Sequence, residues 1–224
     1  MTPFTSADYL ALHRVVFALD MNGKPRWPGY RPEVVEIPNG DGRADAQKRY
    51  AHVKTAYRWR APCIEIEAWG VVGRYFERAF ARACEVAVEL GIPPAFWPAR
   101  EACALRVLEY PPMVGGERHT DFDLFTLNLY RSDGGTCMEV DERSQAWLGI
   151  EQAPEGVHLG ELYDLITGSP SGREQATVHR IDSDTRCQFS LVFFALPSHT
   201  AVLPDGRKVG DWLSERYARS RVAK

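Results

Sequence analysis

Six short apolar runs, separated by turn residues, dominate the second half of the chain. They cover residues 104–110, 124–130, 136–140, 157–163, 176–181 and 188–196. Proline and glycine mark the gaps, as in Pro111-Pro112 and Asp133-Gly134-Gly135. Short strands at this spacing are typical of a sandwich or barrel. A double-sheet jelly roll with an open mouth is the version that leaves room for a ligand.

The residues ahead of these runs favour helices. Thr5-Ser6-Ala7-Asp8 has the form of a capping box and precedes apolar residues at helical spacing. Residues 67–90 hold the same spacing up to Gly91, which predicts a long helix packed on the sheet. We read residues 43–60 as a solvated helix with an inward apolar stripe.

The last stretch, residues 209–224, resembles a terminal amphipathic helix. Trp212, Leu213 and Tyr217 would face the core, and its basic residues, Arg216 among them, would form a solvated face. We therefore expect one α+β, mainly β domain spanning residues 1–224. It would contain a helical region (1–99), a jelly-roll (double-stranded β-helix) core (100–200) and a C-terminal helix (201–224).

Composition limits the classes of partner. The formal net charge of −3 gives no general attraction to nucleic acid or an anionic membrane. The basic and aromatic residues within 43–60 could form a nucleic-acid surface, but Glu65 and Glu67 dilute that charge and favour a solvated helix face. The longest apolar runs are too short to span a bilayer, and the N-terminus lacks the pattern of a secretory signal. Five dispersed cysteines predict reduced thiols and a cytoplasmic protein.

Two motifs offer candidate metal ligands. His119 and Asp121 are two residues apart, so on an extended strand both side chains would point to one face. His179 opens a later β-like run and could lie alongside them if the sheet folds back. Two histidines and a carboxylate on one face of a metal are the ligands of non-haem Fe(II) oxygenases. The spacing alone also fits histidines with a structural role.

Several motifs in order resemble the isopenicillin N synthase-like family of Fe(II)- and 2-oxoglutarate-dependent oxygenases. The match runs from about residue 100 to 200. It includes the Tyr-Pro-Pro turn at 110–112, the metal motif Arg118-His119-Thr120-Asp121, and residues 124–127, 133–135, 157–162, 177–181 and 189–194. The resemblance implies Fe(II) held by His119, Asp121 and His179 as the catalytic centre. It also implies O2 as oxidant and a small organic substrate that is hydroxylated, desaturated or cyclised.

The chain departs from this family at a co-substrate motif. The family's Arg-x-Ser, whose Arg holds a carboxylate, reads Gln188-Phe189-Ser190 here. Glutamine supplies neither the charge nor the bidentate fork of a guanidinium. Arg186 lies two residues upstream, on the same side of an extended strand. The resemblance thus points to Arg186, Gln188 and Ser190 as co-substrate contacts, whereas the family's Tyr contact has no position that we can assign. The N-terminal region is also shorter than is usual in the family.

Several alternatives remain open at this point. Arg186 could replace the family's Arg, Arg106 could reach in from another strand, or 2-oxoglutarate is not used. In the last case the protein would be an oxidase whose substrate binds iron directly, as in isopenicillin N synthase. A non-catalytic jelly-roll binding module is a further alternative.

Residues beside the motifs carry expectations of their own. Arg118 and Asp123 could recognise a charged substrate or form a surface pair. His158 is expected in the core beside the ligands, and Arg180 in a structural ion pair.

Overall fold

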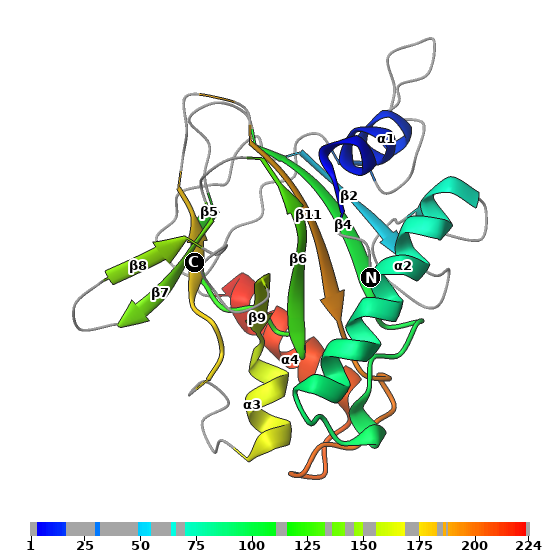
Figure 1. Ribbon diagram of the computed structural model, residues 1–224. Coiled ribbons are helices and arrows are strands. Elements are labelled where there is room, and N and C mark those ends of the chain that lie inside the picture. The colour runs from blue at the N-terminus through cyan, green and yellow to red at the C-terminus, as the bar shows by residue number, and fades with distance from the viewer. Residues whose placement is uncertain are drawn as a thin grey trace.

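Two β-sheets face one another, and helices cover the outer face of the larger sheet (Figure 1). The computed structural model describes residues 4–16, 30–31, 49–54, 64–65, 70–110, 116–132, 136–141, 146–149, 156–168, 175–182, 186 and 188–222. The larger sheet has seven strands in the order β1-β2-β4-β11-β6-β9, with β3 paired to β2, and the smaller has the order β5-β10-β7-β8.

The strands of the larger sheet are β1 (Tyr30–Arg31), β2 (Arg49–Lys54), β3 (Ile64–Glu65), β4 (Ala104–Tyr110), β6 (Phe125–Arg131), β9 (Val157–Leu159) and β11 (Gln188–Ala195). Those of the smaller sheet are β5 (Gly116–His119), β7 (Thr136–Asp141), β8 (Ala146–Gly149) and β10 (His179–Ile181). The helices are α1 (Ser6–Val16), α2 (Gly70–Glu89), the 3-10 turn η2 (Pro94–Phe96), α3 (Glu161–Thr167) and α4 (Val209–Val222).

Strand β11 shows how alternation divides the two faces of the larger sheet. Leu191 and Phe193 are fully buried in the main core, where the Phe193 ring lies 5.4 Å from Phe76 of α2. Val192 points the other way and packs with Leu108, Tyr110 and Ile181 of β10. This second face is therefore turned toward the smaller sheet, and we call it the inner face. Helix α2 covers the opposite face, as the predicted long helix should.

Helix α1 begins with the predicted capping box. The Thr5 backbone N–H donates to Asp8 Oδ2 at 2.9 Å, and the Asp8 N–H donates to Thr5 Oγ1 at 3.2 Å. Tyr9 is buried and its hydroxyl donates to the Leu108 carbonyl at 2.8 Å. The cap and this bond fix α1 against β4.

Some predicted elements differ from the structure. The run 157–163 divides into β9 and α3, and the run 176–181 becomes a strand only at His179. The helix predicted over 43–60 is wrong, because residues 49–54 form β2; the rest of that stretch lies outside the described residues. Strand β2 pairs with β4, Ala51 opposite Val107. Pairing with the edge of β4 gives residues 49–54 backbone hydrogen bonds, and this favours a strand over the helix that the weak helical spacing of their apolar residues predicts.

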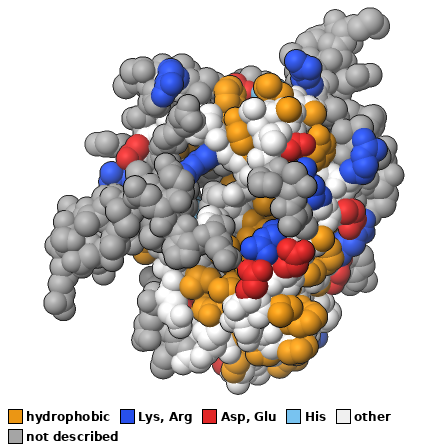
Figure 2. All heavy atoms as spheres, viewed as in Figure 1, with side chains coloured by type: hydrophobic (Ala, Val, Ile, Leu, Met, Phe, Trp, Pro, Cys, Tyr) orange, Lys and Arg blue, Asp and Glu red, His pale blue; other side chains and the backbone are white. Residues whose placement is uncertain are grey.

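The face drawn in Figure 2 carries interspersed charges. Basic and acidic side chains lie next to one another there, with no large area of one sign among the described residues. In the described part of the chain, every helix is too short or too polar to cross a lipid bilayer.

Candidate metal centre

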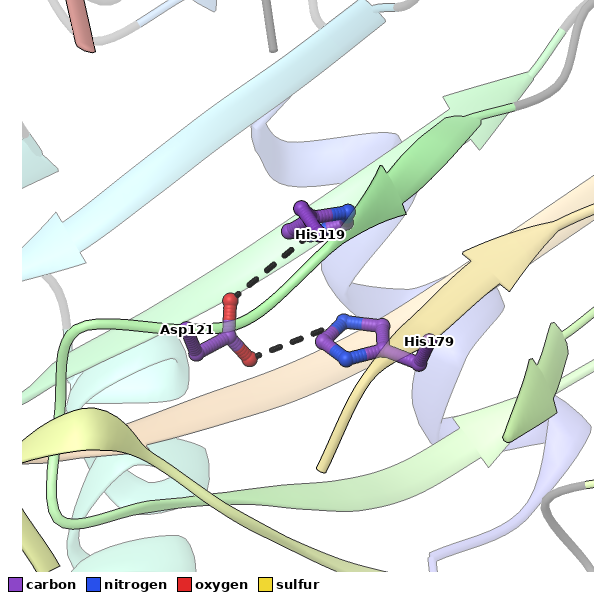
Figure 3. A group of neighbouring side chains, drawn as sticks. All are labelled: His119, Asp121 and His179. Carbon is purple, nitrogen blue, oxygen red and sulfur yellow. Dashed lines mark ion pairs between the residues drawn. The ribbon is translucent and has the colours of Figure 1, made fainter. Parts of the chain in front are cut away.

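His119, Asp121 and His179 converge where β5 meets β10 (Figure 3). His119 is the last residue of β5 and His179 the first of β10, and the two are direct partners in the ladder. Asp121 Oδ1 lies 3.8 Å from His119 Nε2, and Asp121 Oδ2 lies 3.8 Å from His179 Nε2. Bonds from a divalent metal such as zinc to these donor types are about 2.0–2.2 Å long. Donors at this separation can therefore reach one ion.

Asp121 does not lie on a strand, which corrects the predicted geometry. Strand β5 ends at His119, and Asp121 belongs to residues 120–124, which we call the ligand loop. Its carboxylate comes near the histidines through the path of the loop and not through strand alternation. The ligand loop is attached to the start of α3, where the Glu161 N–H donates to the Asp121 carbonyl at 2.9 Å.

His179 has its ring nitrogens assigned by a hydrogen bond. Its Nδ1 lies 3.0 Å from the Thr177 carbonyl oxygen, which can only accept, so Nδ1 carries the proton and donates. Nε2, the atom that faces Asp121, is then left with a lone pair. A histidine that donates from one nitrogen and offers the other is the usual form of a metal ligand.

The carboxylate of Asp121 is held in its ionised form. Burial alone would raise its pKa, but the positive charge that His179 and His119 carry when protonated, with the hydrogen bond from the Thr126 hydroxyl, lowers the pKa below its ordinary value. Thr126 Oγ1 lies 2.6 Å from Asp121 Oδ2. A metal ligand must be deprotonated, so this environment favours binding of a cation.

Asp123 has the opposite environment two residues later. It is buried, and burial followed by the charge of Asp121 raises its pKa well above the ordinary value. Its Oδ2 lies 2.8 Å from Thr126 Oγ1, and that hydroxyl has only one proton to give. The Thr126 hydroxyl thus lies within hydrogen-bonding distance of both carboxyl groups and can donate to only one of them at a time. Because Asp123 is buried while Arg118 is exposed, the surface pair considered for these residues is wrong.

His158 lies behind the ligands, as expected. It is buried, and its ring centroid is 4.3 Å from that of His179. Asn128 Nδ2 donates to the Gly156 carbonyl at 3.3 Å and to His158 Nε2 at 3.0 Å, which assigns the His158 proton to Nδ1. Burial, and next the neighbouring His179, lower its pKa well below the ordinary value. His158 is thus a neutral group packed against a candidate ligand.

The residues expected to contact a co-substrate do not all come together. Gln188 and Ser190 are buried on the inner face, and Gln188 Nε2 donates to the Asp182 carbonyl at 2.7 Å. Arg186 is exposed, on the chain leading into β11. Arg106, the other arginine considered, lies on the inner face with its guanidinium 4.5 Å from the Phe194 ring centroid.

The sequence alone did not indicate two further residues of the inner face. Tyr110 of β4 is buried directly opposite Gln188 in the ladder. Arg131 of β6 is directly opposite Ser190, so its side chain leaves the sheet on the same face. The β6–β11 ladder has an irregularity between Leu191 and Val192. Because of this irregularity, simple alternation along β6 places Arg131 on the wrong face of the sheet. Tyr110 could have been identified, because it is two residues from Leu108 on β4 and therefore points to the same face.

Two arginine expectations had different outcomes. Arg180 forms the expected ion pair, with Nε 2.7 Å from Asp182 Oδ1. Arg216 is not on a solvated face. Its guanidinium lies 2.7 Å from Glu161 Oε1, and the two side chains are 14% and 4% exposed.

Comparison with known proteins supports the fold. No protein-family model matches the chain, and no curated protein matches it. Among solved structures, a Caulobacter crescentus protein assigned to the 2OG-Fe(II) oxygenase family is 20% identical, with a TM-score of 0.65 over 96% of this chain and 87% of that one. The chain has the fold of that oxygenase structure.

Two more solved structures have a similar fold. A full-length Neurospora crassa protein in complex with alpha-KG (2-oxoglutarate) is 16% identical, with a TM-score of 0.67 over 97% of this chain and 84% of that one. The rice dioxygenase for auxin oxidation is 18% identical, with a TM-score of 0.58 over 98% and 83%. At these identities the likeness concerns the fold, and it agrees with the expected α+β class.

Proposed function

We propose that this protein is a non-haem Fe(II) oxygenase whose catalytic metal is held by His119, Asp121 and His179. The observation that carries the proposal is the convergence of these three donors within 4.8 Å of one another. The hydrogen bond from His179 Nδ1 to Thr177 presents Nε2 as a ligand. Two nitrogens and one carboxylate on one side of an ion leave positions open opposite, which suits Fe(II). The bound iron would supply the activation of O2 needed to oxidise an organic substrate.

The surrounding residues would position this centre and keep it dry. Thr126 holds one Asp121 oxygen through its hydroxyl, and His158 packs on the ring of His179. We propose that the two facing sheets form a double-stranded β-helix with its metal at the mouth, as in the isopenicillin N synthase-like family. The paired ends of β5 and β10 and the fold of the compared structures support this arrangement.

For the co-substrate, we propose 2-oxoglutarate bound along the inner face. Ser190, Tyr110 and Gln188 line that face beside one another, and a compared protein was solved with this compound. Its carboxylate needs a positive partner, for which the position of Arg131 opposite Ser190 is better placed than the exposed Arg186. The overall reaction would convert 2-oxoglutarate and O2 to succinate and CO2. The second oxygen atom would enter the substrate on hydroxylation, or leave as water on desaturation or cyclisation.

A second candidate is an oxidase that does not use 2-oxoglutarate. Gln188, which stands where the family has an arginine, favours this oxidase, because its side chain is uncharged and donates a hydrogen bond to the Asp182 carbonyl. The two candidates differ in their products. Anaerobically reconstituted Fe(II) protein would be given O2 with and without 2-oxoglutarate, and succinate would be measured. Succinate formation that needs both iron and O2 supports the oxygenase. No succinate from protein that retains its iron supports the oxidase, in which the organic substrate itself would supply the electrons for O2 reduction.

The substrate and the cellular location are further parts of the proposal. We propose a small organic molecule that is hydroxylated, desaturated or cyclised, in a cytoplasmic protein whose thiols, such as the free Cys84 and Cys103, remain reduced. A protein that bound no iron at all would revive the non-catalytic binding module. Substitution of His119 by Ala should abolish Fe(II) binding if the proposed ligands are correct.

A further inference from the structure

A buried carboxylate joins helix α4 to the ligand loop. Glu161, at the start of α3, is 3% exposed. Its Oε1 accepts a hydrogen bond from Thr120 Oγ1 at 2.8 Å and another from Arg216 of α4 at 2.7 Å. Thr120 is the residue between the two candidate ligands His119 and Asp121. One carboxylate oxygen therefore joins α4 to the centre of the metal-binding motif.

The backbone of the ligand loop is bound to the same place. The N–H groups of Gly160, Glu161 and Leu162 donate to the carbonyls of Leu124, Asp121 and Asp123, at 2.9, 2.9 and 3.1 Å. The first turn of α3 thus holds three loop carbonyls while the Glu161 side chain holds Thr120. These bonds leave the loop little freedom to change the separation of His119 and Asp121.

Helix α4 also packs on the loop directly. The guanidinium carbon of Arg216 lies 4.7 Å from the centroid of the Phe122 ring, and the Tyr217 ring meets Phe122 edge-on at 5.4 Å. Val209, Trp212 and Leu213 bury the start of α4 in the main core. The helix is therefore fixed at one end and presents Arg216 to the loop further along.

From these contacts we propose that Glu161 and Arg216 are positioning residues, through which α4 sets the geometry and affinity of the metal site. Arg216 neutralises the buried Glu161 and orients its carboxylate, which then holds Thr120 between the two ligands. This inference rests on the proposed function, since it concerns the same metal. Loss of Arg216 would remove a charged partner that orients the buried Glu161 carboxylate at 2.7 Å. The carboxylate, no longer oriented by the guanidinium, would then hold Thr120 less firmly.

The test uses Co(II) as a visible probe and a matched pair of variants on α4. Arg216→Met removes the contact with the loop, whereas Arg219→Met makes the same change at a side chain that is 71% exposed. We expect Arg216→Met to weaken Co(II) binding about 10- to 100-fold, as is usual when a partner behind the ligands is lost. It should also change the Co(II) absorption spectrum, while Arg219→Met keeps the wild-type affinity and spectrum.

Thr120→Val provides the second variant. It removes the hydroxyl that Glu161 holds but keeps the ion pair of Glu161 with Arg216, so the protein should fold even if Arg216→Met does not. Its Co(II) affinity should also fall, although the metal-free protein unfolds at nearly the wild-type temperature. The proposal is overturned if both Thr120→Val and Arg216→Met bind Co(II) as tightly as Arg219→Met does. If Arg216→Met is unfolded, the same result for Thr120→Val alone overturns it.

Hydrogen exchange of the metal-free proteins separates this inference from the proposed function. The amides of residues 120–124 should exchange faster in Arg216→Met than in Arg219→Met, whether or not a metal binds; equal rates would contradict the inference. If wild-type protein failed to bind Co(II) while exchange still differed, the proposed metal function would fail and the coupling of α4 to the loop would stand.

Discussion

Gly160 is the residue at which the structure makes its sharpest prediction about stability. Its backbone is extended (φ −99°, ψ 172°), a conformation that alanine adopts freely. A Cβ there, however, would lie closer than 3.0 Å to both the carbonyl oxygen and Oδ1 of Asp123. Both obstacles belong to a buried residue bonded to α3 and Thr126. The ligand loop and α3 would have to separate to accept Gly160→Ala.

The expected cost has two parts. Overpacking a well-packed site costs about 1–3 kcal/mol. Lengthening the bond from Leu162 N–H to the Asp123 carbonyl adds about 1 kcal/mol. We expect the free energy of unfolding of the metal-free protein, measured in urea, to fall by about 2–4 kcal/mol. Co(II) affinity should fall as well, because Asp121 belongs to the displaced loop.

Gly210→Ala is the matched control. Its Cβ would meet His199 at 3.2 Å, which asks for a shift of only a few tenths of an ångström, and alanine favours the helical state there. That variant should keep wild-type stability and metal affinity. If Gly160→Ala unfolded at the same urea concentration as Gly210→Ala, the close approach of the loop to α3 would be refuted.

Two further predictions concern the start of the chain and the co-substrate. Burial raises the pKa of Asp8, but the bonds from Thr5 and the nearby Arg78 outweigh it and lower the pKa below 3.8. Its ionised form therefore stabilises the fold above the unfolded-state pKa, and this contribution is lost as pH falls through the lower folded-state value. Asp8→Ala should cost about 1 kcal/mol in urea unfolding at pH 7 and much less at acidic pH; a cost independent of pH would contradict the ionic cap. Arg131→Met should weaken 2-oxoglutarate binding about 10- to 100-fold through loss of a charge-assisted bond. Arg186→Met should change it little, and the reverse order, measured by equilibrium titration, would move the anchor to Arg186.

The identities of the candidate ligands could be predicted from the sequence, whereas their local geometry could not. Residue type and spacing make His119, Asp121 and His179 candidates, and the resemblance of several motifs to the isopenicillin N synthase-like family selects them as ligands. The bond pattern that places Asp121 depends on the start of α3, far along the chain. The apolar residues of 157–163 are compatible with a strand or with a helix, so the sequence alone does not predict the division into β9 and α3. The helix begins at Glu161 because Gly160 approaches Asp123 closely and because three carbonyls of the ligand loop accept hydrogen bonds from the start of α3.

The same limit explains the errors over β2 and Arg216. Residues 49–54 form a strand because β4 has an edge to pair, which is a property of another segment. In the sequence, Arg216 is one of several basic residues near the end of α4 that are expected to be exposed. Only the fold shows that the buried Glu161 lies next to it. Local periodicity predicts which elements form, but partners distant in sequence decide the exceptions, and here those exceptions surround the metal centre.

The most direct test of the central proposal is an anaerobic titration of the Fe(II)-loaded protein with 2-oxoglutarate, followed by visible absorption. If the iron is held by His119, Asp121 and His179 with open positions opposite, a metal-to-ligand charge-transfer band should grow to saturation with one equivalent bound. The band should be absent in His179→Ala treated in the same way. A protein that retains iron but gives no band would contradict the use of 2-oxoglutarate. A band that persists in His179→Ala would contradict the proposed ligands.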